Sequence, residues 1–195
     1  DGINDGAEID QDLNPLDGLG FPTGIIANQP LKGEALDVSV VGSLVDSSSQ
    51  TAYVATGSHG LAVIDASNFT NPILLGQIDL AGKNRQVDAD AGRGLAFVAA
   101  ESAGLHIVDT SDPLMLELVT TVTRLGRINS VESLDGILMT GGDQLAVLNA
   151  STGEVYTQLS LGGEVKSLAV DGEQVFAVVN NEELVSLFFD GESFL

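Results

Sequence analysis

Short apolar motifs return along the chain at nearly constant spacing. Residues 60–65 read GLAVID and residues 104–109 read GLHIVD, and looser versions follow at residues 144–149 and 183–188. The anchoring leucines are spaced 44, 40 and 39 residues apart: Leu61, Leu105, Leu145 and Leu184. A period of this length in a β-rich sequence indicates one four-stranded unit per repeat.

The apolar pattern around each motif predicts the other strands of the unit. A glycine precedes a predicted core residue by five positions in every repeat, at Val38, Val87, Val131 and Leu168. We expect first strands at residues 36–40, 87–90, 131–134 and 168–170. We expect second strands at residues 52–55, 95–99, 137–140 and 175–179. The third strand is the motif itself, and fourth strands are expected at residues 73–80, 115–122 and 155–161.

Turn residues separate these strands. The pairs Asp135-Gly136 and Asp171-Gly172 are typical of type I′ hairpins. After the third strand, an Asp or Asn stands two residues before a Ser, which predicts an Asx turn at the corner. The residues of these predicted turns are Asp65, Ser67, Asp109, Ser111, Asn149 and Ser151.

Four short strands per unit, with no periodic segment of helical length, predict an all-β fold, a β-propeller of four-stranded antiparallel blades. The predicted blades are residues 33–81, 82–125, 126–162 and 163–195, the first three complete and the fourth partial. Residues 23–31 are interpreted as an outer strand without a blade of its own. That strand could complete the fourth blade and close a four-bladed ring; we favour instead the leading portion of a larger propeller.

At these repeated motifs the chain resembles the LVIVD-repeat family of β-propellers. The resemblance is close over residues 33–122 and looser over residues 123–195. It departs from the pattern at Asn149, at Met139 and at Ser186. The resemblance implies a propeller fold without defining a function.

Residues 1–22 form a separate acidic stalk or linker. Their carboxylates match the second half of an EF-hand-type loop, with Asp1, the carbonyl of Ile3, Asp5 and Glu8 as candidate calcium ligands. Residues 1–18 resemble thrombospondin type 3 repeats, which implies calcium as a cofactor. The alternative is an acidic linker that binds no metal.

The formal net charge is -21, from 28 acidic and 7 basic residues, which disfavours nucleic-acid and membrane-surface binding. The chain has no cysteine, and no apolar run approaches the roughly 18–20 residues of a membrane span. The partners that remain are other surface proteins, copies of this chain, and polysaccharide.

Catalytic motifs are not evident. His59 and His106 are at non-equivalent positions of successive repeats, and no G-x-S-x-G elbow or paired-histidine metal motif occurs. We therefore expect no catalytic residues. Acids on the predicted inner strands could ring a cation or simply be hydrated: Asp37, Asp88, Asp90 and Glu132. Five of the basic residues fall between residues 83 and 127, and local charge balancing is the preferred interpretation.

These observations predict a non-catalytic scaffold or interaction module, secreted or on the cell surface of a bacterium or archaeon, that serves protein binding, adhesion or surface assembly. One alternative is a subunit of a polymeric surface filament or sheath that pairs through open strand edges. Another is an enzyme or carbohydrate-binding propeller with its site at the channel mouth. A cluster of titratable residues from several blades on one face would favour the last.

Overall fold

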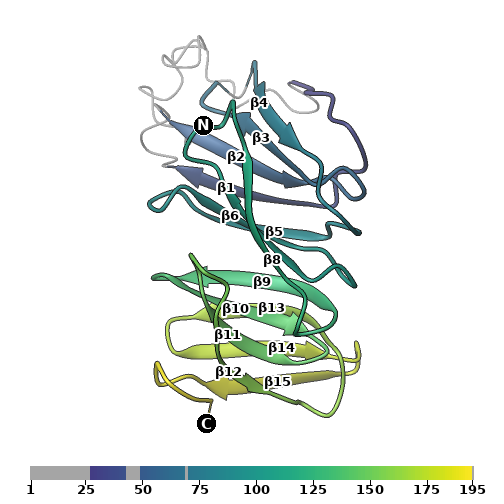
Figure 1. Cartoon of the computed structure of the whole chain (residues 1–195), viewed down its shortest axis with the longest axis vertical. Helices are drawn as coiled ribbons and strands as arrows, with labels where there is room; N and C mark the ends of the chain where they lie inside the picture. The colour runs from purple at the N-terminus through teal and green to yellow at the C-terminus, as the bar shows by residue number, and fades with distance from the viewer. Residues whose placement is uncertain (1–26, 43–48, 69, 195) are drawn as a thin grey trace, which may run out of the picture.

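The computed structural model describes residues 27–42, 49–68 and 70–194. These residues form four antiparallel sheets in chain order, three with four strands and the last with three. The first sheet lies near the top of Figure 1 and the last near the bottom. The described residues contain no helix that could cross a membrane.

Each sheet is a meander in which neighbouring strands are consecutive in sequence. The first blade contains β1 (Asp37–Gly42), β2 (Gln50–Ala55), β3 (Leu61–Asp65) and β4 (Ile73–Ile78). The second contains β5 (Gln86–Asp90), β6 (Leu95–Ala99), β7 (Leu105–Asp109) and β8 (Glu117–Val122). The third contains β9 (Ile128–Leu134), β10 (Ile137–Gly142), β11 (Leu145–Asn149) and β12 (Val155–Leu159). The fourth contains β13 (Val165–Asp171), β14 (Gln174–Val179) and β15 (Glu183–Phe188). The predicted all-β propeller architecture is confirmed, including the incomplete fourth blade.

The core lies between consecutive blades. Because side chains alternate across a strand, each central strand presents one apolar face to the preceding blade and one to the following blade. Tyr53 and Val63 of the first blade pack with Val87 and Val98 of the second. The same positions recur at the next two interfaces, in clusters that contain Phe97 and Ile107, and then Met139 and Val147.

The array of blades is open. The inner strands pack in the sequence β1, β5, β9 and β13, and among the described strands no comparable packing joins β13 to β1. Val38 was predicted as a core residue, and this prediction is wrong, because its side chain is 57% exposed. Its equivalents Val87, Val131 and Leu168 are buried by the blade that precedes them.

The fourth blade has the complementary open face. Phe176 and Leu184 occupy the alternate positions of β14 and β15 that in the other blades pack under the next sheet. Leu184 is 72% exposed and Phe188 is 41% exposed. A single bridge between Phe189 and Phe194, whose ring centroids are 5.3 Å apart, follows β15.

The predicted outer strand at residues 23–31 is corrected for its described part. Residues 27–31 form no strand, and the backbone of Lys32 is bound by Gln77 of β4, whose amide donates to the Lys32 carbonyl over 2.8 Å. Leu31 packs beside the apolar cluster of the first blade. The described part of this segment, from residue 27 onward, therefore contacts the first blade.

One of the two predicted type I′ hairpins is also corrected. Asp135 and Gly136 both have positive φ, as a type I′ turn requires. In the second hairpin Asp171 pairs with Gln174, so the central residues are Gly172 and Glu173. Gly172 alone has positive φ there, which fits a glycine at the first position of a type II′ turn.

Candidate functional site

A pocket of about 440 Å³ opens where the inner strands of all four blades begin. Three of its lining side chains are cationic, namely Lys83, Arg85 and Lys166. Polar side chains from each inner strand complete much of the wall: Asp37, Gln86, Asn129, Ser130 and Ser167. We call this pocket and the charged residues behind it the channel mouth.

The repeat itself brings these residues together. The repeats can be aligned on the core position that Val87, Val131 and Leu168 occupy. Lys83 of the second blade and Arg127 of the third each stand four residues before this position. Arg85 and Lys166 are each two residues before it, in the second and fourth. Since equivalent positions of consecutive blades lie side by side, cations far apart in sequence converge at one end of the inner strands.

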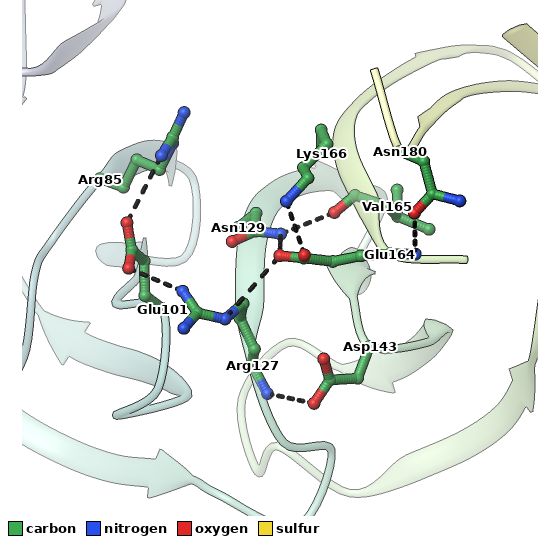
Figure 2. A network of polar contacts seen from close by, with 9 residues as sticks. All are labelled: Arg85, Glu101, Arg127, Asn129, Asp143, Glu164, Val165, Lys166 and Asn180. Carbon is green, nitrogen blue, oxygen red and sulfur yellow. Dashed lines mark hydrogen bonds and ion pairs between the residues drawn. The ribbon is translucent and has the colours of Figure 1, made fainter. Parts of the chain in front are cut away.

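Glu101 joins the second blade to the third (Figure 2). Its carboxylate accepts hydrogen bonds from Arg127 Nη1 over 2.7 Å and from Arg85 Nη1 over 3.4 Å. Burial alone would raise the pKa of Glu101, but the bonds from Arg127 and Arg85 and the nearby charge of Lys83 lower it overall. Glu101 is therefore a fixed anion that holds two cations in place.

Glu164 joins the third blade to the fourth in the same network (Figure 2). Lys166 Nζ lies 2.5 Å from Oε2, Asn129 Nδ2 lies 2.8 Å from Oε1, and Arg127 Nε lies 3.8 Å from Oε1. The bonds from Lys166 and Asn129 lower the pKa of Glu164. Asn180 adds a bond by accepting from the Glu164 backbone N–H over 2.9 Å. Arg127 of the third blade thus connects a carboxylate of the second blade to one of the fourth, so the polar network of the mouth spans three blades.

Side-chain oxygens also accept hydrogen bonds from backbone N–H groups along the free edge of the inner strands. An inner strand is a sheet edge whose unpaired N–H groups need acceptors. In each case a side chain of one inner strand accepts from the backbone of the next: Asp37 from Val87 over 3.0 Å, Gln86 from Val131 over 2.8 Å, and Asp88 from Ser133 over 2.7 Å. Two of the predicted inner-strand acids, Asp37 and Asp88, therefore bind the neighbouring blade.

Glu132 is the inner-strand acid with the most perturbed environment. Burial, followed by the charges of Asp88 and Asp37, raises its pKa to about 7, against a bond with Gln86 that lowers it. The folded protein therefore holds a proton that the unfolded chain releases, and stability falls as the pH rises from 4.5 to about 7.

Replacing Glu132 with glutamine removes this pH dependence. We expect Glu132→Gln to unfold at a higher urea concentration than the wild type at pH 8. Its free energy of unfolding should be larger by about 1–2 kcal/mol, after allowance for partial exposure of the side chain. Below pH 4.5 the two proteins should have equal stability. The control is Glu154→Gln at an exposed carboxylate. A difference between Glu132→Gln and wild type that is the same at both pH values would contradict the raised pKa.

The predicted Asx turns lie at the end of the blades opposite the mouth. In the first blade Leu61, at the start of β3, pairs with Ala55, which in turn pairs with Asp37 at the mouth end of β1. Asp65, at the other end of β3, pairs with Thr51. In each turn the Ser backbone N–H donates to the Asp or Asn Oδ1, over 3.0 Å at Asp65 and Ser67, 2.8 Å at Asp109 and Ser111, and 2.9 Å at Asn149 and Ser151. The bonds from Ser67 and Ser111 lower the pKa of the two aspartates. These turns shape corners and contribute nothing to the mouth.

The two histidines lie apart from each other. Nδ1 of His59 is 3.0 Å from the hydroxyl of the adjacent Ser58, in an exposed turn. His106 is buried in β7, with Nε2 2.8 Å from the Ala81 carbonyl and Nδ1 2.9 Å from the Thr121 hydroxyl. Burial lowers the pKa of His106, so its ring is neutral at pH 7. Its two contacts hold β7 to the neighbouring strand β8 and to the segment that leads from the first blade into the second.

The candidate calcium ligands Asp1, Ile3, Asp5 and Glu8 lie outside the described residues. In the part of the chain that the structure describes, no group of three or more His, Asp or Glu side chains is arranged to hold a metal ion.

The LVIVD repeat model matches residues 32–79 and 94–124. These segments cover most of the first blade and most of the second. The match supports a relationship of these two blades to the LVIVD repeat family. No curated protein matches the chain.

Solved structures show the same fold at low identity. The computationally designed protein Ika4 is similar with a TM-score of 0.66 and 8% identity over 87% of this chain and 99% of Ika4. The computationally designed Ika8 gives a TM-score of 0.57 with 11% identity over 80% of this chain, and Sqt1 of Saccharomyces cerevisiae gives 0.65 with 13% identity over 83%. This chain spans 46% of Ika8 and 47% of Sqt1. The chain has the β-propeller fold, and its first two blades match the LVIVD repeat.

Proposed function

We propose that this chain is a non-catalytic interaction module that binds partner proteins through the channel mouth, and that it works outside the cell or at its surface. The observation that carries the proposal is the convergence of charged and amide side chains from all four blades on one pocket. Glu101 and Glu164 brace this set across two blade interfaces. Rigid sheets that present a fixed polar surface suit recognition.

The side chains at the mouth favour binding over catalysis. Ser130 and Ser167 line the pocket, and neither is hydrogen-bonded to a histidine in the described residues. A hydroxyl needs such a base to act as a nucleophile. Three of the cations at the mouth, Arg85, Arg127 and Lys166, are instead held by carboxylates, as in a docking surface.

The acidic stalk belongs to the same proposal. Calcium bound by Asp1, Ile3, Asp5 and Glu8 would suit an extracellular protein, where calcium is abundant, and the absence of cysteine is compatible with that location.

Lysine footprinting tests the proposed function, because the chain has three lysines in contrasting places. Lys83 and Lys166 line the mouth, whereas Lys32 lies beside β4 of the first blade. The full chain is acetylated alone and in the presence of surface-protein extract from its source cells, with calcium and then with chelator. We expect protection of Lys83 and Lys166 but not of Lys32.

Equal labelling of the three lysines with and without extract would contradict a docking role for the mouth. Protection that is identical with calcium and with chelator would remove calcium from the proposal and leave the docking role in place.

A further inference from the structure

The channel mouth concentrates positive charge on a strongly acidic protein. Four of the seven basic residues of the chain lie in or directly behind the pocket: Lys83, Arg85, Arg127 and Lys166. The pocket lining holds three cations against one carboxylate, Asp37, while Glu101 and Glu164 offset part of the charge from behind. The rest of the chain is acidic and repels anions, so the lining is where an anion is attracted.

Two of these cations keep donors that no carboxylate uses. Lys83 is exposed and makes no ion pair with the described residues. Arg85 reaches Glu101 through one nitrogen at 3.4 Å, a long contact, and its side chain is 53% exposed. Arg127 and Lys166, by comparison, make short contacts of 2.7 and 2.5 Å to carboxylates. Lys83 and Arg85 can therefore bind a further anion without breaking the network.

Ser130 lines the pocket, but its hydroxyl is not part of the anion site. The hydroxyl oxygen is closed to solvent and lies beside Gly141, between the third and fourth blades. The donors that an anion in the pocket can reach are therefore those of Lys83 and Arg85.

We propose that the channel mouth binds carboxylate side chains of an acidic segment in a partner protein, through Lys83 and Arg85. This inference rests on the proposed function and adds the chemistry of the partner. A volume of about 440 Å³ admits a few side chains, which fits a loop or chain end. None of the lining residues is aromatic, so the pocket lacks the flat ring against which a sugar would stack.

The test measures fluorescence anisotropy of a short labelled peptide of alternating Asp and Glu, titrated with the full chain at low salt. We expect saturable binding that Lys83→Gln weakens about 3- to 10-fold, as loss of one partly exposed charge contact predicts. Arg93→Gln is the matched control. It removes a positive charge from the same blade at the opposite end of β5, where Arg93 pairs with Asp90 over 2.6 Å. Its affinity for the peptide should equal that of the wild type.

Three outcomes would overturn the inference: no binding of the peptide by the wild type, equal weakening by Lys83→Gln and Arg93→Gln, or binding of an acidic oligosaccharide such as oligogalacturonate with none of the peptide. Equal weakening would mean that only the net charge matters. The two proposals can be distinguished. If the footprint shows protection of Lys83 and Lys166 but the acidic peptide does not bind, this inference is overturned and the proposed function stands.

Discussion

Replacing Phe97 with alanine is expected to lower the free energy of unfolding by about 3–5 kcal/mol. The side chain is fully buried and lies in the cluster between the second and third blades, against Val131 and Leu138. Its removal leaves a cavity at an interface that holds both blades in register, and the surrounding strands cannot collapse into it without breaking their pairing. Urea unfolding followed by circular dichroism gives the change.

The matched control is Phe188→Ala on the open face of the fourth blade. Phe188 is 41% exposed, so we expect a loss of about 1 kcal/mol or less from the same chemical change. A loss as large as that of Phe97→Ala would show that a second copy or another sheet covers this face in solution. That result would favour the filament alternative, and the midpoint would then also rise with protein concentration.

Replacing Asp88 with alanine is expected to cost about 2–3 kcal/mol, because its carboxylate makes charge-assisted hydrogen bonds between blades. Oδ2 accepts from the backbone N–H of Ser133 over 2.7 Å and from its hydroxyl over 2.6 Å. Oδ1 accepts from the hydroxyl of Ser39 over 3.3 Å. One side chain thus connects the inner strands of three blades.

A second measurement separates this role from ordinary destabilisation. The charge of Asp88 helps raise the pKa of Glu132, so Asp88→Ala should lower that pKa from about 7 towards 4.5, as read by NMR titration of the Glu132 carboxyl. The control is Asp90→Ala on the same strand, which removes the exposed pair with Arg93 and should cost about 1 kcal/mol or less. An unchanged pKa of Glu132 in Asp88→Ala would contradict the proximity of the two acids.

The repeated motif predicts most of the strands because its period and alternation come from local residue patterns. Leu95–Ala99 and Glu183–Phe188 form at the predicted residues. Burial at the ends of the array was less predictable. Val38 has the same residue type and spacing as Val87, but its burial depends on a preceding blade that does not pack against β1.

The channel mouth was only partly visible in the sequence. Five of the basic residues fall between residues 83 and 127, but Lys166 lies far from them along the chain. Aligning the repeats on their core position would have found the match between Arg85 and Lys166. The alignment could not have shown that Arg127 spans Glu101 and Glu164, because that contact depends on how the blades pack.

The most direct test of the central claim is a crystal structure of the full chain with the acidic peptide. The account predicts an open array with a peptide carboxylate within hydrogen-bond distance of Lys83 Nζ and Arg85. A peptide bound elsewhere, or a pocket filled because β13 has closed against β1, would contradict it.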